Sequence, residues 1–293
     1  MIEITRAGDN DRQIVEEIGK HYDPSFINHV YNTWEERGGL YIARREGRTV
    51  GFCGLVFPAP TEAQILGIRL LPDFQREDVG RQFVIGLIQV AQEKGCNTVR
   101  MLTSTENWET QAALQRNLNF VRRGTWAVAY REEMRSELCD SRQSLEPASP
   151  EILDDIWQYL QYSMTYRHSE GLIFNNGYTY RQFSKAYLNQ LLEQGRVYAC
   201  DSGGVITGVI IAHCQDDTMH LHYVDAQPTV VKDLLLGILA RHCECKCNYL
   251  TAAVPTDSYR EIRPLLEQVV KEHAPDYWLV MEKEVSPLAL PRD

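Results

Sequence analysis

The alternation of apolar and polar positions divides the chain into short strands and longer helices. The run QILGIRLL at 64–71 is typical of a buried strand. The polar stretch FQREDVGR at 74–81 follows it, and the sequence then takes up helical spacing of apolar positions through Ile88. A strand, a tight polar turn and a helix start can bind phosphate through backbone amides. The pattern therefore marks this turn as a candidate anion site.

A second pattern is an internal repeat. Four segments of the first half resemble four segments of the second half, in the same order. The pairs are 4–18 with 144–159, 35–52 with 192–209, 95–101 with 246–252, and 125–133 with 277–285. Within these matches Ala43 corresponds to Ala199 and Gly51 to Gly208. Because the order is kept with only small insertions, we predict a tandem duplication.

The repeat also predicts the fold class and the domain boundaries. Each half is expected to give a strand, helices, a hairpin, and then further strands alternating with helices. This order predicts an α/β fold with a mixed sheet and helices on both of its faces. The polar, Pro- and Ser-containing segment CDSRQSLEPASP at 139–150 is typical of a linker. We therefore expect domains at 1–139 and 145–293.

The first half resembles the GNAT superfamily of acyl-CoA-dependent N-acyltransferases over roughly residues 2–133. The likeness lies in IRLLPDFQREDVGRQFVIGLI at 68–88. There Gln75, Val79 and Gly80 fit the family's phosphate-turn pattern, and Asp78 replaces its first glycine. The family's later Asn-to-helix segment is echoed by NWETQAALQRNLNF at 107–120, with Asn119 where glycine is usual. The resemblance implies two tandem GNAT-like modules.

The resemblance implies that the first module binds acetyl-CoA or another acyl-CoA. Free amides in the turn and at the helix start would hold the pyrophosphate, helped by the helix dipole. The implied cofactor-binding residues are Ile68, Leu70, Gln75, Arg76, Glu77, Asp78, Val79, Gly80, Arg81 and Asn107.

Asp78 is the main departure from the family pattern in this turn. Recognition by backbone amides needs an accessible conformation rather than a particular side chain, and Asp tolerates left-handed φ better than most residues. Its carboxylate could also cap the helix and use the amides that a phosphate would bind. We expect Asp78 to weaken anion binding without abolishing it.

The acid and base positions that the resemblance implies hold unsuitable residues. The family's glutamate base on the fourth strand corresponds to Gln64, which cannot accept a proton. Glu62 lies two residues earlier on the same strand face and is the nearest substitute, although a solvated hairpin charge explains it equally well. The tyrosine acid corresponds to Gln115, which donates hydrogen bonds but does not titrate.

The second half lacks the phosphate turn. Its strand-to-helix segment, MHLHYVDAQPTVVKDLLLGIL at 219–239, has no glycine in the loop and carries Pro228, which has no N–H group. We expect this module to have lost acyl-CoA binding and to shape the acceptor site.

Further features of the second half have a packing and a functional interpretation. His220 and His222 project from one strand face and are more readily explained as packed or solvated side chains than as metal ligands. The run RHCECKC at 241–247 lacks the usual spacing of zinc ligands, so we predict no metal site. The aromatic stretch 162–183 is either packed on the sheet or a wall over the acceptor site.

Composition and charge narrow the remaining classes of function. The net charge is −10, of which residues 1–139 carry −2 and 140–293 carry −8. This acidic balance argues against nucleic-acid binding and against transfer that depends on tRNA. The sequence shows neither a membrane span nor an export signal. Eight cysteines without regular spacing then predict free thiols and a cytoplasmic location.

The resemblance therefore implies an N-acyltransferase that moves an acyl group, expected to be acetyl, from acyl-CoA to an amine. The acceptor would be a small molecule or a peptide, and the two halves together favour a monomer. The alternative is an acyl-CoA-binding protein without transfer activity, which the glutamines at positions 64 and 115 motivate.

Overall fold

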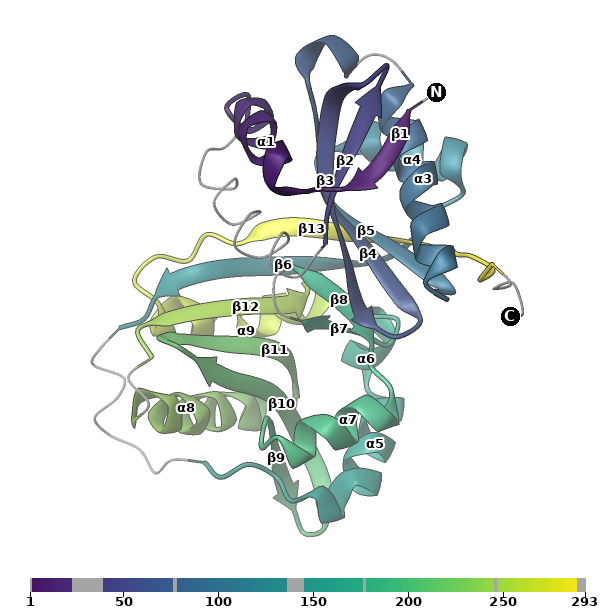
Figure 1. The fold of residues 1–293 in the computed structure, drawn as a ribbon. Helices are drawn as coiled ribbons and strands as arrows, with labels where there is room; N and C mark the ends of the chain where they lie inside the picture. The colour runs from purple at the N-terminus through teal and green to yellow at the C-terminus, as the bar shows by residue number, and fades with distance from the viewer. Residues whose placement is uncertain are drawn as a thin grey trace. The chain divides into compact units, whose positions relative to one another are not determined.

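The computed structural model describes residues 2–22, 39–75, 78–135, 145–175, 178–244 and 247–288 (Figure 1). The chain divides into two compact units. Unit 1 consists of Met1–Arg122 and Val280–Asp293, and unit 2 consists of Arg123–Leu279. Both are mixed α/β structures, as the repeat predicted.

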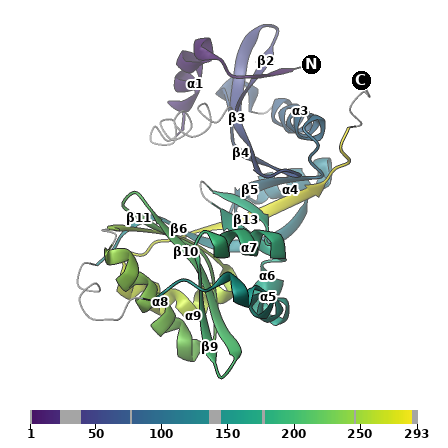
Figure 2. The same cartoon turned by 60° about the horizontal axis from the view of Figure 1, so that its bottom comes forward.

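Unit 1 is built on a mixed sheet with the strand order β1-β2-β3-β4-β5-β13. Its strands are β1 (Glu3–Arg6), β2 (Leu40–Arg45), β3 (Arg48–Ala59), β4 (Glu62–Leu70), β5 (Thr98–Ser104) and the last residues of β13 (Asp276–Glu284). Its helices are α1 (Arg12–Gly19), α3 (Val79–Glu93) and α4 (Trp108–Leu118). Helices α1 and α3 lie on opposite sides of β2 and β3 (Figures 1 and 2). Both faces of the sheet are therefore covered.

Unit 2 repeats this plan with the strand order β6-β12-β11-β10-β9. These strands are β6 (Val121–Glu133), β9 (Val197–Ser202), β10 (Val205–Gln215), β11 (Thr218–Ala226) and β12 (Tyr249–Pro255). A separate hairpin joins β7 (Leu172–Asn175) and β8 (Thr179–Gln182). The helices are α5 (Leu153–Tyr162), α6 (Met164–His168), α7 (Lys185–Glu193), α8 (Pro228–Glu244) and α9 (Thr256–Val269).

Successive side chains of β10 are buried in two different hydrophobic cores, one on each face of the sheet of unit 2. Ile210 and Ala212 of β10 are buried in the core that includes α8 and α9. Val209 and Ile211 of the same strand are buried in the core that includes α5 and α7. Side chains alternate between the faces of a strand, so a strand covered on both sides reads as a continuous apolar run.

The two matched glycines have the same structural role in the two units. Gly51 pairs with Leu70, and a Cβ atom on Gly51 would lie 2.6 Å from the carbonyl oxygen of Arg69. Gly208 pairs with Ala226, and its Cβ atom would lie 2.6 Å from the Cβ atom of that residue. In both units, the absence of a side chain lets two neighbouring strands approach closely. This agreement supports the duplication.

The last strand of each sequence half belongs to the other unit. β6, which ends the first half, pairs antiparallel with β12 inside unit 2. β13, which ends the second half, follows β5 in the strand order, and Val285 N donates to Asn97 O at 2.8 Å in unit 1. The domains at 1–139 and 145–293 thus stay a prediction about the repeat, and the compact units cut across them.

The structure corrects two sequence-based expectations. The repeat match at 144–159 predicted a strand before a helix, but no strand is assigned over the described residues 145–149, where Ala148 N donates to Val197 O of β9. Cys247 is not free, because it forms a disulfide with Cys214 over a Cα–Cα distance of 6.8 Å. Strand pairing brings these cysteines together across a sequence separation of 33, so their spacing gave no signal.

Candidate functional site

The centre of the candidate site in unit 1 is the place where β4 and β5 separate. The two strands pair in parallel only from Glu62↔Thr98 to Ile65↔Met101, although both are fully described beyond that point. The rest of β4, including the predicted residues Ile68 and Leu70, therefore has an edge that β5 does not cover. Parted parallel strands can receive an extended ligand, which would pair with the uncovered strand edge.

Tyr22, which follows α1, occupies part of this uncovered edge. Its hydroxyl donates to Leu70 O at 2.9 Å and lies 3.4 Å from Leu70 N. Gln75 donates to the same hydroxyl at 2.8 Å, and the Arg69 guanidinium lies 4.8 Å from the centre of the Tyr22 ring. A ligand that binds the Leu70 backbone must displace this hydroxyl. Sequence reasoning missed Tyr22 because its contact with β4 spans 48 residues.

The turn that follows β4 ends at the first residues of α3. Asp78 precedes the helix with φ −70°, and its side chain makes no capping hydrogen bond. Instead the carboxylate accepts from Arg81 at 3.1 Å, with both side chains about half exposed. The suggested capping role and left-handed conformation of Asp78 are therefore wrong in this structure. The first amides of α3, including those of Val79 and Gly80, have no intrahelical acceptor.

Gly80 leaves open space beside these amides. A Cβ atom at this position would meet only the Cδ1 atom of Leu70, at 3.5 Å, which is an ordinary contact. Val79 is buried and fixes the helix start, whereas Arg81 is exposed. Arg76 and Glu77 lie outside the described residues. The turn thus joins a helix start to the uncovered edge of β4.

The segment around α4 holds two more of the predicted positions. Asn107 caps α4, accepting from Thr110 N at 3.1 Å, so its amide group already has a structural role. Asn119 ends the helix with φ 57°, a left-handed conformation that explains why the family has glycine at this position. Gln115 is exposed on α4. The structure does not bring Gln115 into contact with Glu62 or Gln64 in any described interaction.

The proposed substitute base, Glu62, belongs to a buried ion cluster. The Arg100 guanidinium binds the carboxylates of Glu62 and Glu282, the latter at 2.7 Å, and all three side chains are at least nine-tenths buried. The guanidinium thus compensates two buried carboxylates, and loss of any one member would leave uncompensated charge in the interior. Gln64 is also buried, at 1% exposure. The environment of Glu62 therefore favours a structural role.

Unit 2 repeats the strand separation. β11 and β12 pair in parallel over four residues, from Thr218↔Tyr249 to Leu221↔Ala252, and then part. By register, His220 corresponds to Gln64 of unit 1. The loop after β11 is short and leads directly into Pro228 at the start of α8. The repeat thus extends to the cleft, but the turn chemistry differs.

His220 and His222 do share a strand face, where they meet His213 of β10. His222 Nε2 lies 2.9 Å from His213 Nδ1, and the three rings are stacked. Burial lowers the pKa of His222 to about 3 and lowers that of His220 as well. Within the described residues no group of histidine, cysteine and acidic side chains has a geometry that could hold a metal ion. The packing interpretation fits this cluster.

The aromatic stretch at 162–183 packs against the sheet of unit 2. The ring of Phe174 lies 5.8 Å from that of His222, and the ring of Tyr180 lies 4.8 Å from that of Trp126. Phe174 O also lies 3.1 Å from His222 Nδ1. These contacts agree with the first of the two interpretations of this stretch, and a role in acceptor binding stays a prediction.

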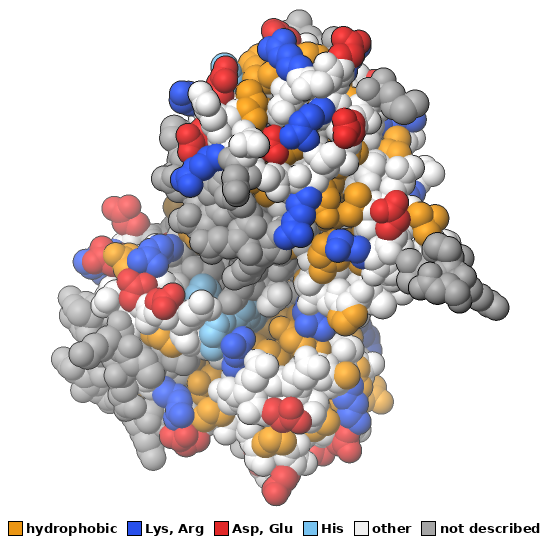
Figure 3. Space-filling model, viewed as in Figure 1, with side chains coloured by type: hydrophobic (Ala, Val, Ile, Leu, Met, Phe, Trp, Pro, Cys, Tyr) orange, Lys and Arg blue, Asp and Glu red, His pale blue; other side chains and the backbone are white. Residues whose placement is uncertain are grey.

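On the face drawn in Figure 3, Lys and Arg side chains are interspersed with Asp and Glu. No helix of the described chain combines the length and hydropathy that a membrane crossing requires.

Comparison with known proteins agrees with this geometry. Residues 12–120 match the model of the acetyltransferase (GNAT) family. Residues 12–120 therefore form a GNAT-family acetyltransferase domain. No curated protein sequence matches the chain significantly.

Solved structures share the fold of the whole chain. A GCN5-related N-acetyltransferase from Sphaerobacter thermophilus has a TM-score of 0.57 at 8% identity, with 97% of this chain and 95% of that chain covered. A candidate acetyltransferase from Thermoplasma acidophilum has a TM-score of 0.52 at 12% identity, with 95% and 91% covered. One from Pyrococcus horikoshii has a TM-score of 0.51 at 13% identity, with 98% and 90% covered. At such identities the likeness concerns the fold alone.

Proposed function

We propose that the chain is an acyl-CoA-dependent N-acyltransferase, with acetyl-CoA as the expected donor. The observation that carries the proposal is the parting of β4 from β5 directly before the free amides at the start of α3. An extended pantetheine arm would lie along the uncovered edge of β4. The pyrophosphate would meet the amides of Val79, Gly80 and Arg81, where the helix dipole favours an anion.

Acyl transfer requires a neutral amine at the thioester carbon. The amine nitrogen attacks the carbonyl carbon, the carbon–sulfur bond breaks, and CoA leaves as a thiolate that takes up a proton. An aliphatic ammonium with a pKa of about 10.4 must first lose a proton to a base or to water. We assign no base to this chain, because Glu62 is bound to Arg100. The roles suggested for Gln64 and Gln115 stay predictions.

A second candidate function is acyl-CoA binding without transfer. The residues at the acid and base positions favour this second function, because neither can exchange a proton. Gln64 is buried, Gln115 is exposed, and both are neutral. A non-catalytic module would keep the cleft and the helix start while losing the titrating groups. It would bind CoA tightly and leave the thioester intact.

Calorimetry and a thiol-release assay separate the two candidates. Titration with CoA is expected to give one site per chain, since the loop before α8 carries Pro228 and no glycine. Thiol release from acetyl-CoA is then measured against a panel of small amines and peptide N-termini. Release above the background rate with any amine supports transfer, and saturable CoA binding without release on the whole panel supports the binder. Absence of CoA binding contradicts both.

The partners follow from the same proposal. The acceptor is an amine on a small molecule or a peptide, and the chain acts as a monomer because its two units provide internally what single modules obtain by pairing. Sedimentation at micromolar concentration tests the second statement. A dimer that persists on dilution contradicts it.

A further inference from the structure

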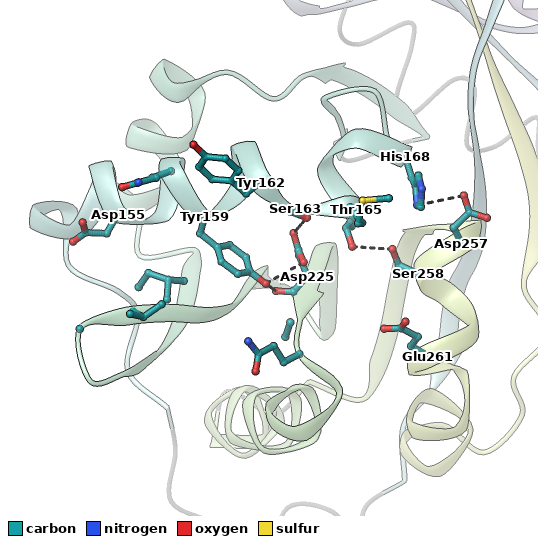
Figure 4. Close-up of a pocket in the computed structure, with 17 residues that line it drawn as sticks. Asp155, Tyr159, Tyr162, Ser163, Thr165, His168, Asp225, Asp257, Ser258 and Glu261 are labelled. Atoms are coloured by element: carbon teal, nitrogen blue, oxygen red, sulfur yellow. Dashed lines mark hydrogen bonds and ion pairs between the residues drawn. The ribbon is translucent and has the colours of Figure 1, made fainter.

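A cavity of about 630 Å³ opens in unit 2 where β11 ends and α9 begins. α5 and α6 line it from one side, and Asp225 and Gln227 line it at the end of β11 (Figure 4). Glu261 projects toward it from α9. Its volume lies in the range of clefts that hold small organic ligands.

By the internal repeat, this cavity lies at the counterpart of the place where β4 and β5 separate in unit 1. In each unit, a pair of parallel strands parts after four paired residues, and a helix follows each strand. Unit 2 thus has the same strand separation without the glycine-containing turn that would hold a pyrophosphate. The charge and polarity of the residues that line the cavity indicate which class of ligand it could hold.

The charge of the lining excludes an anionic ligand such as CoA. Four carboxylates line the cavity, from Asp155, Asp225, Asp257 and Glu261, and neither lysine nor arginine does. His168 also lines the cavity, and its Nδ1 atom lies 3.5 Å from the carboxylate of Asp257. Within the described parts of the chain, neither Asp225 nor Glu261 forms an ion pair. A phosphate would be repelled here, whereas a cation would be attracted.

Asp225 gives the cavity a fixed negative centre. It is 8% exposed, and it accepts hydrogen bonds from Tyr159 at 3.1 Å, from Tyr223 at 3.0 Å and from Ser163. Three hydroxyl donors hold the carboxylate in one orientation, although burial raises its pKa. A cation beside it would lower the pKa and replace the lost hydration. The carboxylate is thus positioned rather than loosely solvated.

The other side chains that line the cavity could contact the alkyl chain of a cationic ligand. Tyr159 and Tyr162 supply aromatic rings, and Met164, Val205 and Ile206 supply apolar surface. Aromatic faces attract ammonium groups, and apolar walls bury the alkyl chain that carries them. A bare metal ion would use the carboxylates but none of this apolar surface.

We propose that this cavity binds a small organic cation, namely an aliphatic di- or polyamine with protonated nitrogen atoms. One ammonium group is held near Asp225, another is held by Glu261, and the alkyl chain lies against the tyrosine and aliphatic side chains. The site binds the amine and changes no bond in it. Binding does not rest on the transferase proposal, because it needs no acyl-CoA.

Calorimetry on the full chain without acyl-CoA tests the proposal, with 1,4-diaminobutane and spermidine as probes. Both amines are expected to bind at one site per chain, with spermidine tighter, and raising the salt concentration should weaken both. The uncharged 1,4-butanediol should bind at least tenfold more weakly than 1,4-diaminobutane. Mg²⁺ at the amine concentration should not displace the amine. Comparable affinity for the diol, or displacement by Mg²⁺, overturns the proposal.

Two variants on the same helix locate the site. Glu261→Gln removes a lining charge and should weaken spermidine binding at least fivefold. Glu267→Gln removes an equal charge from α9 outside the cavity, where Glu267 pairs with Arg263, and should leave binding unchanged. Equal effects of the two variants would reduce the binding to general surface charge and overturn the proposal. Because both side chains are exposed, the folded state should tolerate both changes.

A third variant tests the buried anchor. Asp225→Asn keeps the shape and removes the charge, so spermidine binding should fall by more than it does in Glu261→Gln. If this variant fails to fold by circular dichroism, the comparison of Glu261→Gln with Glu267→Gln decides alone. CoA affinity should be the same in wild type and in Glu261→Gln. Loss of CoA binding would therefore count against the transferase proposal alone, and loss of amine binding against the cation site alone. Unchanged spermidine affinity in a folded Asp225→Asn overturns the assignment.

Discussion

The two units separate a pair of parallel strands in the same way, but the residues that follow these strands differ in their chemistry. In unit 1, β4 parts from β5 and leads through a turn to a helix start that has free amides and a glycine. In unit 2, β11 parts from β12 after the same number of paired residues, but its loop carries Pro228 and its cavity is lined by carboxylates. If both proposals hold, the same strand arrangement serves an anion in one unit and a cation in the other. Ligand class would then follow from a few residues at the strand ends, and not from the fold.

The largest expected difference between the units is in the free energy of unfolding that corresponding residues of β5 and β12 contribute. Arg100 on β5 corresponds by register to Thr251 on β12. Arg100→Ala leaves the carboxylates of Glu62 and Glu282 buried without their cation, so it should destabilise the chain by about 3–5 kcal/mol. Thr251→Val removes only an acceptor for Arg131 N and should cost about 1 kcal/mol.

Urea unfolding monitored by circular dichroism measures both changes. If Arg100→Ala costs no more than Thr251→Val, the ion cluster does not stabilise unit 1. Arg263→Ala, which breaks the exposed pair with Glu267, serves as the surface control and should change stability by less than about 1 kcal/mol.

The next effect concerns CoA binding at the start of α3. Gly80→Asp adds a Cβ atom and a charge beside the free amides, so it should weaken CoA binding by about 2 kcal/mol, or roughly 30-fold. Gly80→Ala adds the Cβ atom alone and should have a smaller effect, because its nearest new neighbour is 3.5 Å away. Calorimetry at constant salt measures both. Wild-type affinity in a folded Gly80→Asp would place the pyrophosphate elsewhere.

A smaller effect tests the histidine cluster that replaces Gln64 in unit 2. The pKa of His222 is lowered to about 3 in the folded state from its usual 6.5, so the unfolded chain binds more protons between these values. Stability should therefore fall as the pH drops below about 6.5, by up to about 1.4 kcal/mol per pH unit from this group. Above pH 7 the effect is absent, because the histidine is neutral in both states.

Urea midpoints at pH 7.5, 6 and 5 measure this slope. His222→Gln should flatten it, whereas the exposed His21→Gln should not. A slope that is the same in His222→Gln and wild type would exclude His222 as its source.

The smallest expected effect concerns Asp78. Its carboxylate does not cap α3 and pairs with Arg81 in an exposed position, so its main influence on a pyrophosphate is screened repulsion. Asp78→Gly should strengthen CoA binding by at most about 1 kcal/mol. Asp73→Asn, a charge change in the preceding turn, is the control. A weaker affinity in Asp78→Gly would mean that the carboxylate supports the turn.

The sequence predicted what depends on local pattern and on the repeat. The hairpins around Gly51 and Gly208 and the turn before Gly80 follow from residue type and spacing. The alternation of His220 and His222 also predicted their shared face. Each of these features requires knowledge of no more than one element and its neighbours.

The features that the sequence did not reveal depend on distant pairing. Tyr22 reaches β4, Glu282 completes the Arg100 cluster, and His213 joins the histidines from a neighbouring strand. Asp225 drew no attention, because nothing in the spacing links it to the hydroxyl of Tyr159. Such contacts follow from sheet register and helix packing, which short sequence patterns do not encode.

The place of β13 in the sheet of unit 1 has a consequence for biosynthesis. Its final residues reach β5 only after more than 280 residues have been translated, so a ribosome-bound first half waits with the outer edge of β5 and the Arg100 cluster incomplete. The released first half, ending at residue 139, would lack the strand that closes its own sheet and would expose an edge open to pairing with other chains. Completion of the sheet of unit 1 is therefore coupled to the synthesis of β13.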